Sequence, residues 1–163
     1  MSDPKIISKA FKTEYNNIVR ALRTKVILFA VSAPPPNKTL VVNAIWDTGA
    51  TDSVITPNIA QQLSLFGVDT VNIAGVNSEG VAPVSLVHIG LPNSVLVPSS
   101  RVTIAKIGGG ADMLIGMDII SRGDFLICNA DGKTTFSFVM PPFPDKPDWV
   151  ERSNKINQSD TEQ

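Results

Sequence analysis

The sequence predicts an all-β protein with one or two short helices. Of its 163 residues, 43% are hydrophobic and 18% are charged, which is typical of a globular chain. The 11 Gly and 12 Pro residues indicate many turns. Apolar runs recur at the roughly 8 to 12 residue spacing that is typical of sandwiches and barrels. The length is that of a single domain.

The first strands are expected after a short helical segment. Residues 5–23 place apolar side chains at irregular helical spacing, so a short amphipathic helix is expected there. Val26–Val31 and Thr39–Trp46 are β-type runs separated by three consecutive prolines, and they are expected to form a hairpin. Thr56 followed by Pro57 is an N-cap with proline at the first helical position, which predicts a short helix.

The middle of the chain is expected to be all β. The further expected strands are Asp69–Ala74, Val81–Gly90, Asn93–Val97, Arg101–Ile107, Asp124–Cys128 and Thr134–Met140. An Asp-Gly pair at 131–132 supplies the turn of the last hairpin, and Leu114–Ser121 is expected to be a short helix. The polar tail Glu151–Gln163 is expected to be disordered.

Charge and composition exclude several classes of function. A net charge of -1 leaves no basic excess for phosphates, so no nucleic-acid partner is expected. The longest apolar run, Val26–Ala33, is far shorter than the ~20 residues of a membrane span, and no secretory signal is present. A soluble, cytoplasmic protein without a membrane partner is therefore expected. One His and one Cys form no ligand cluster, so no metal and no cofactor is expected; Cys128 is expected in a strand core and His88 on a strand surface.

The segment that carries chemistry is Asp47-Thr48-Gly49-Ala50, which follows an apolar strand and precedes the capped turn. An Asp-Ser/Thr-Gly tripeptide occurs by chance in roughly one chain in fifteen of this length, judged from average residue usage. A second, independent signal is therefore needed to support it. Without such a signal, Asp47 would be interpreted as an Asx-turn residue that ends a strand.

The second signal is Leu114-Ile115-Gly116, a hydrophobic-hydrophobic-Gly motif in the second half of the chain. Because Gly116 has no Cβ, its backbone can pass tightly beside the loop that carries Asp47. The segment between the motifs is long enough for several strands and a flap.

Together the two motifs resemble those of the retropepsins, the family of the retroviral proteases and related cellular and bacterial proteins. The resemblance implies an acid-protease barrel whose active site lies at a homodimer interface. It covers roughly residues 25–141, the expected protease domain, between an N-terminal extension (1–24) and a Pro-rich, polar tail (142–163). The extension is interpreted either as an added dimer element or as a removable pro-segment.

The resemblance assigns roles by position. Asp47 would be the catalytic residue, Thr48 would turn its hydroxyl toward the partner's loop, and Gly49 would hold the substrate main chain close. Ala50 stands where some relatives carry a Ser that favours ionisation of the nearby Asp, so a higher working pH is hypothesised. Thr51 departs from the acidic residue usual in the retroviral loop, so no substrate contact is assigned to it.

The flap and the residues around the catalytic loop are less closely defined. Glycines bracket a polar turn, which is expected to be the tip of a substrate-binding flap: Gly75, Val76, Asn77, Ser78, Glu79 and Gly80. An ordinary hairpin turn is the alternative. Asp52 either lines a substrate subsite or bonds the local backbone. Asp118 is expected to face solvent or cap a helix, Arg122 to brace the dimer through an acidic partner, and Trp46 to pack behind the loop.

The implied activity is that of an aspartic endopeptidase acting on a protein or peptide substrate. One carboxylate activates water while a second, protonated, donates to the carbonyl and then to the leaving nitrogen. Two such groups about 3 Å apart share a proton. The chain has one such motif, so the second carboxylate is expected from another copy. One alternative is a non-catalytic dimerising or peptide-binding module. Another is a carbohydrate-active enzyme that pairs Asp47 with Asp52 or Glu79, but no motif in the sequence supports it.

Overall fold

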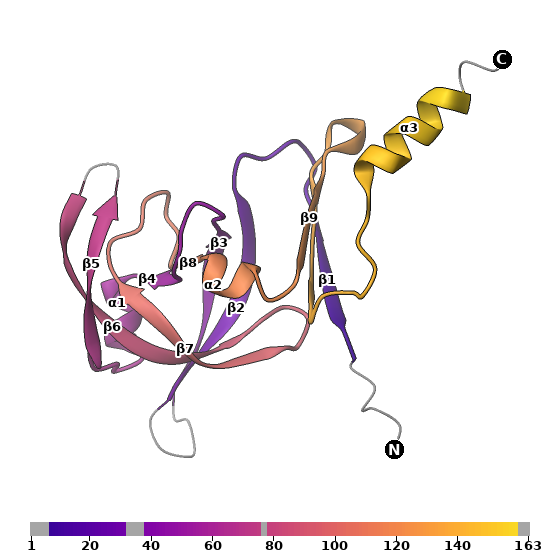
Figure 1. Ribbon diagram of the computed structural model, residues 1–163. Coiled ribbons are helices and arrows are strands. Elements are labelled where there is room, and N and C mark those ends of the chain that lie inside the picture. The colour runs from indigo at the N-terminus through magenta and orange to yellow at the C-terminus, as the bar shows by residue number, and fades with distance from the viewer. Residues whose placement is uncertain (1–6, 32–37, 76–77, 160–163) are drawn as a thin grey trace, which may run out of the picture.

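The structure is a closed β-barrel with a smaller sheet at one end (Figure 1). It is a computed structural model that describes residues 7–31, 38–75 and 78–159. The larger sheet consists of β2 (Leu22–Ala30), β3 (Thr39–Trp46), β4 (Val54–Ile55), β5 (Asp69–Gly75), β6 (Ser78–Gly90), β7 (Leu96–Ile104) and β8 (Met113–Ile115). Its order is β2-β3-β8-β4-β7-β6-β5, and because β2 also pairs with β6, six strands close into a ring. The predicted all-β barrel is confirmed.

Alternating burial along the strands places the hydrophobic core inside this ring. In β2 every second residue from Leu22 to Ala30 is buried. In β3 the buried residues are Val42, Ala44 and Trp46, so the chain leaves the core directly before Asp47. The register of β3 therefore sets the point at which the Asp47 loop begins.

Two local predictions are confirmed next to this loop. Strands β2 and β3 form the expected antiparallel hairpin, with Leu22 opposite Trp46. Helix α1 (Pro57–Gln62) begins where expected, and the Thr56 hydroxyl accepts a hydrogen bond from the Ile59 amide at 3.4 Å. The buried face of α1 packs against the barrel, which anchors the chain on the far side of the loop.

A three-stranded sheet with the order β1-β10-β9 lies beside the barrel. Its strands are β1 (Lys9–Glu14), β9 (Asp124–Cys128) and β10 (Thr135–Met140), and between the last two lies η1 (Ala130–Gly132). Aromatic rings join this sheet to the barrel: the Trp46 ring centroid lies 4.8 Å from that of Phe138 and 5.2 Å from that of Phe136. Trp46 thus packs behind the Asp47 loop, as predicted, and the last hairpin is also confirmed.

The helix expected within residues 5–23 is wrong, because residues 9–14 form strand β1. Along this segment half-buried and exposed residues alternate, with Phe11 and Thr13 facing inward and Lys12 and Glu14 facing solvent. The partner strand, β10, lies more than a hundred residues away, so local spacing alone did not reveal the pairing. The division of the chain at residues 24 and 141 remains a prediction.

The two strands expected at Asn93–Val97 and Arg101–Ile107 are a single strand, β7. Within it Ser99 has a positive φ of 48°, and its amide donates a hydrogen bond to His88 Nδ1 at 2.9 Å. The irregularity is absorbed by a register shift against β6, and pairing continues on both sides of it. Asn93 lies before the strand, where its amide group donates to the Lys9 carbonyl.

Two further expectations in the second half of the chain are corrected. The helix expected at Leu114–Ser121 is the shorter α2 (Met117–Ile120), because the preceding residues form β8 between β3 and β4. Cys128 is exposed rather than buried, because β9 is an edge strand of the smaller sheet.

The described part of the polar tail, residues 151–159, is helical rather than disordered. Helix α3 (Trp149–Ser159) projects away from the barrel (Figure 1). Asp148 Oδ1 accepts hydrogen bonds from the Val150 and Glu151 amides, both at 2.9 Å, and Glu151 pairs with Lys155 one turn later at 2.6 Å. A local cap and an i,i+4 pair therefore favour a helix in this polar segment. Residues 160–163 lie outside the described part of the chain.

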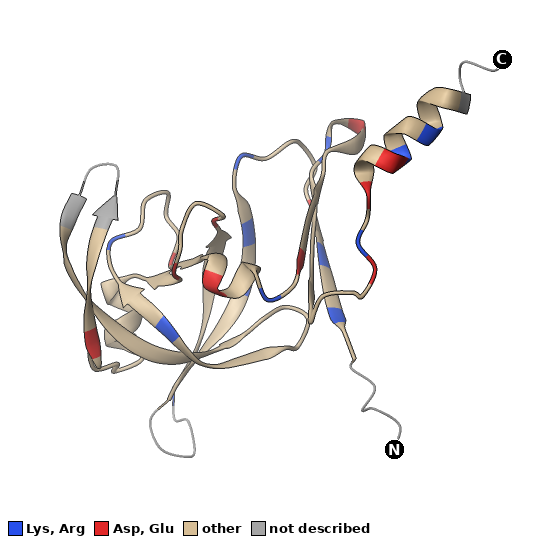
Figure 2. Ribbon diagram, in the orientation of Figure 1, with Lys and Arg blue, Asp and Glu red and all other residues tan. Residues whose placement is uncertain are grey.

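Charged residues of both signs are spread over the barrel, the smaller sheet and α3 (Figure 2). Lys and Arg do not gather on one element, in keeping with the net charge of -1. Within the described residues, no helix is long and apolar enough to cross a membrane.

The role of β1 can be tested by replacing Phe11 with Ala. The Phe11 ring lies 5.4 Å from the Phe136 ring and 5.8 Å from the Trp46 ring, so its loss leaves a gap in the aromatic cluster. We expect the free energy of unfolding to fall by about 3 kcal/mol in urea titrations. Lys12→Ala, on the outward face of the same strand, is the matched control and should change it by less than about 0.5 kcal/mol. Equal values for the two variants would contradict the inward orientation of Phe11.

Candidate active site

Asp47 is half-buried at the end of β3, where the chain leaves the barrel core. Its amide donates a hydrogen bond to the Ile115 carbonyl at 2.9 Å, and its carboxylate Oδ1 accepts one from the Gly49 amide at 2.9 Å. A Cβ added to Gly49 would lie 3.2 Å from the same oxygen, so a larger residue would crowd the carboxylate. The loop therefore fixes the orientation of Asp47 with its own backbone.

Gly116 lies directly against this loop. A Cβ built on Gly116 would be 2.7 Å from the Asp52 carbonyl oxygen and 2.9 Å from that of Ala50, closer than real Cβ contacts. The close approach allows the Met117 amide to donate to the Ala50 carbonyl at 2.8 Å. The two motifs singled out in the sequence are thus brought together, and Leu114 and Ile115 lie beside β3 in a parallel pair.

Ser53 and Asp118 form a second connection between the two motifs, which sequence reasoning missed. Ser53 is fully buried; its hydroxyl accepts a hydrogen bond from the Gly116 amide at 3.1 Å and donates one to Asp118 Oδ1 at 2.8 Å. The Asp118 amide donates to the Thr51 carbonyl at 3.1 Å. Asp118 was expected to face solvent or cap a helix. It is instead half-buried against the loop.

The surroundings of Asp118 shift its titration. Burial raises the pKa of the Asp118 carboxyl above its ordinary value, and the nearby Asp52 charge raises it further. The hydrogen bond from Ser53 and the positive charge of Arg122 act in the opposite direction, but more weakly than burial. Arg122 donates through Nε to the Asp118 backbone carbonyl at 2.8 Å, so its contact within the chain is with a backbone oxygen.

Asp47 lines a pocket of about 390 Å³ between the barrel and the smaller sheet. The lining residues come from the segment before β2, from the end of β3 and from β9: Arg20, Ala21, Leu22, Ile45, Trp46, Asp47, Thr48, Phe125 and Ile127. The exposed Arg20 places a positive charge in this pocket, a feature that no sequence motif indicated.

Asp52 lines a different pocket, of about 240 Å³. That pocket also contains Val71 and Val84, from the two strands of the β5–β6 hairpin, together with Arg101. Arg101 forms an ion pair with Asp69 at 2.9 Å. Asp52 therefore meets the hairpin that the sequence indicated as a flap, and it does not share the pocket of Asp47.

The β5–β6 hairpin extends the barrel sheet at its edge, and its last described pair joins Gly75 to Ser78. Val76 and Asn77, at the predicted flap tip, lie outside the described residues. Glu79 lies opposite Ala74, and Gly80 lies opposite Ile73. The strands on either side of the predicted flap tip therefore pair as a hairpin, and the role of that hairpin as a flap remains a prediction.

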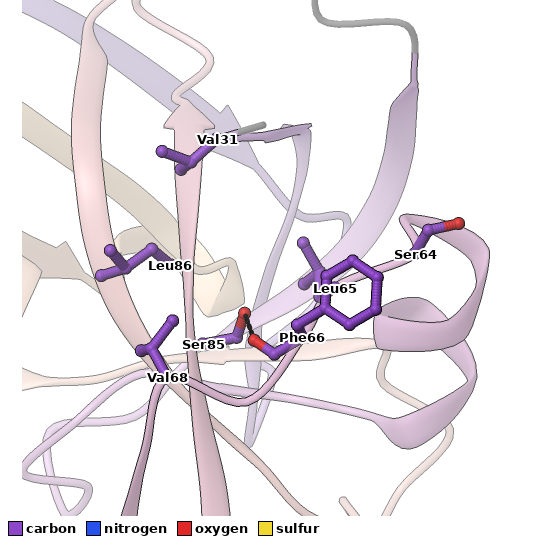
Figure 3. Close-up of a pocket in the computed structure, with 7 residues that line it drawn as sticks. All are labelled: Val31, Ser64, Leu65, Phe66, Val68, Ser85 and Leu86. Atoms are coloured by element: carbon purple, nitrogen blue, oxygen red, sulfur yellow. Dashed lines mark hydrogen bonds between the residues drawn. The ribbon is translucent and has the colours of Figure 1, made fainter. Parts of the chain in front are cut away.

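A further pocket of about 220 Å³ lies between β6 and the segment after α1, and Figure 3 shows its lining residues. The Ser85 hydroxyl donates a hydrogen bond to the Phe66 carbonyl at 2.8 Å and ties the two segments together. The pocket is mostly apolar and contains no ionisable side chain. We therefore do not regard it as a catalytic centre. In the described part of the chain, no group of three or more His, Cys, Asp or Glu side chains could hold a metal ion.

Among the solved structures that resemble this chain, the first of the following shows the fold. A crystal structure of a retropepsin-like aspartic protease from Rickettsia conorii aligns with a TM-score of 0.53 and 16% identity, over 82% of this chain and 96% of that one. The EIAV protease complexed with the inhibitor HBY-793 aligns with a TM-score of 0.47 and 22% identity, over 66% of this chain and 90% of that one. The retroviral protease-like domain of Ddi1 from Leishmania major gives a TM-score of 0.39 and 16% identity, over 69% and 91%. No curated protein sequence matches.

The sequence profile of the family described as aspartyl protease matches residues 37–119. This range is just over half of the chain and includes both the Asp47 loop and Gly116. The chain therefore belongs to the aspartyl protease family, and its fold is that of the retropepsin-like aspartic proteases.

Proposed function

We propose that this protein is an aspartic endopeptidase that acts as a homodimer, with Asp47 of each copy forming one shared active site. The observation that carries the proposal is the loop geometry. The Asp47 carboxylate accepts a hydrogen bond from the Gly49 amide and lines a pocket, on a loop that packs closely against Gly116. Such rigid support is what a catalytic carboxylate needs, because small displacements of a reacting group lower the rate strongly.

The chemistry requires a second carboxylate beside the first. One carboxylate takes a proton from water while the other, protonated, donates to the substrate carbonyl and then to the leaving nitrogen. Two carboxylates about 3 Å apart share one proton, which supplies both forms at once. Asp52, the nearest acidic residue along the chain, lines another pocket, so we infer that the partner copy supplies the second carboxylate.

The surface that we propose for this dimer is the free edge of β9. Within the described residues, β9 is the outer strand of its sheet, and its backbone groups on that side are unpaired with another strand. Leu126 and Ile127 on this strand are 43% and 46% exposed, so the edge presents two adjacent large apolar side chains. Ile127 also lines the pocket of Asp47. Two β9 strands related by a two-fold axis would therefore bring the two Asp47 pockets together.

We propose that the substrate is an extended peptide that lies across both loops. The β5–β6 hairpin would cover it, because Val71 and Val84 of that hairpin line the pocket next to Asp52. The exposed Thr48 would contact the partner loop, and Gly49 would leave room for the substrate main chain. Ala50 contributes its carbonyl to the contact with α2.

The first test replaces Asp47 with Asn. The amide retains the size of the side chain and an oxygen that can accept from Gly49, but it cannot exchange a proton with water. We expect cleavage of denatured proteins, measured between pH 4 and 8 by mass spectrometry of the products, to fall at least about a thousandfold. Sedimentation should show an unchanged dimer. Asp145→Asn, at an exposed position between β10 and α3, is the control and should cleave normally.

If the Asn variant cleaves as well as the natural protein, Asp47 is not the catalytic residue. If neither protein cleaves anything although both dimerise, the endopeptidase proposal fails, and a peptide-binding module becomes the better interpretation.

The second test addresses the interface. Replacing Leu126 with Lys places a charge on the β9 edge, where two symmetry-related lysines would repel each other and disfavour strand pairing. We expect dissociation to monomers in sedimentation equilibrium and a matching loss of cleavage, with the unfolding midpoint of the monomer retained. Val41→Lys, an equally apolar substitution site that is 67% exposed on β3, is the matched control. A dimer that persists in the Leu126 variant would exclude β9 as the interface.

A further inference from the structure

Asp118 is the half-buried carboxylate that the proposed chemistry leaves unused. It lies in the first turn of α2, and its backbone and side chain both reach the loop that carries Asp47. The amide contacts the Thr51 carbonyl, and the carboxylate contacts the Ser53 hydroxyl. These two contacts distinguish Asp118 from a carboxylate that is exposed to solvent in the first turn of a helix.

Among the described residues, the Ser53 hydroxyl donates its single proton to Asp118 Oδ1. The oxygen already accepts from the Gly116 amide at 3.1 Å, so the proton is directed to Asp118 Oδ1 at 2.8 Å. The Ser53 side chain is fully buried, and a hydroxyl left without an acceptor there would be destabilised. Asp118 is therefore the group that completes the hydrogen bonding between the loop and Gly116.

We propose that Asp118 is a positioning residue for the active site: by accepting the Ser53 hydroxyl, it holds the Asp47 loop against Gly116. This inference rests on the proposed function for its catalytic consequence, but the loop contact itself can be measured without any catalysis. Asp118 does not line the Asp47 pocket and therefore acts through the loop rather than on the substrate.

The charges around Asp118 make this contact sensitive to pH. In the described structure, the charged groups that act on it are Asp52, on the loop, and Arg122, at the end of α2. Burial and Asp52 raise its pKa, so the carboxylate takes up a proton at a higher pH than an exposed Asp. Because an ionised acceptor forms a stronger hydrogen bond than a neutral one, protonation weakens the grip on Ser53.

The same shift has a consequence for stability. Because the pKa of Asp118 is raised in the folded state, the folded protein binds this proton more tightly than the unfolded chain does. The resulting contribution to stability is fully present at a pH below the pKa of Asp118 in the unfolded chain, and it is lost as the pH rises through the pKa in the folded state.

The test compares Asp118→Ala, Asp118→Asn and Ser53→Ala with Ser121→Ala. The last is a matched control, because the Ser121 hydroxyl donates to the Met117 carbonyl within α2 and does not touch the loop. Amide hydrogen exchange at Gly116, Met117 and Asp118 reports the loop contact in each protein. The kcat and KM for a peptide substrate, measured across the pH range, report its consequence.

We expect Asp118→Ala and Ser53→Ala to exchange these amides about tenfold faster or more, and Ser121→Ala to stay close to the natural protein. Asp118→Asn, which keeps a weaker acceptor for the Ser53 hydroxyl, should lie between the natural protein and Asp118→Ala. In activity, Asp118→Ala should lose about tenfold in kcat with little change in KM. Asp118→Asn, which resembles the protonated form, should match the natural protein at low pH and fall several-fold behind it as the pH rises. A merely structural residue would give a ratio that does not depend on pH.

Unchanged exchange in Asp118→Ala would overturn the positioning role whether or not the protein cleaves peptides. Faster exchange in the Ser121 control, or failure of Asp118→Asn to restore any protection relative to Asp118→Ala, would overturn it as well, because α2 would then be responding to any change. Loss of the proposed function looks different: the natural protein and Asp47→Asn would be equally inactive, while the exchange data would still decide the role of Asp118.

Discussion

The absence of a side chain at Gly116 is the constraint on which the site depends. Any Cβ at this position would overlap the carbonyls of Ala50 and Asp52. With only a hydrogen there, β8 can lie between β3 and β4 and tie down both ends of the Asp47 loop. The contacts from Ile115, Met117 and Asp118 to the loop all follow from this one close approach. The loop is therefore shaped by a strand distant in sequence rather than by its own residues alone.

The parts that the sequence revealed are those in which a few adjacent residues dictate the local structure. The Thr56-Pro57 cap, the Asp-Gly turn of the last hairpin and the small residues of the Asp47 loop each restrict the backbone at their own position. The pairing of the loop with Gly116 was also predictable, because only glycine permits that approach.

The parts that the sequence did not reveal depend on partners far along the chain. β1 is a strand because β10 lies beside it, and Asp118 is half-buried because Ser53 needs an acceptor. Neither the β1–β10 pairing nor the Ser53–Asp118 hydrogen bond is indicated by the residues next to it in the sequence. Arg20 enters the Asp47 pocket through the course of the segment before β2, and the exposure of Cys128 follows from the edge position of β9. Helix α3 is supported by the Asp148 cap and the Glu151–Lys155 pair, whereas the polar composition of this segment predicted disorder.

All three strands of the smaller sheet, β1, β10 and β9, are present in the described chain, and the outer edge of β9 has no strand partner there. In the proposed dimer this edge would pair with its counterpart in a second copy, and the two copies would separate on dilution. At protein concentrations well below the dissociation constant of the dimer, the concentration of active sites would rise with the square of the protein concentration. The amount of protein that a cell makes would by itself act as the control on when cleavage begins.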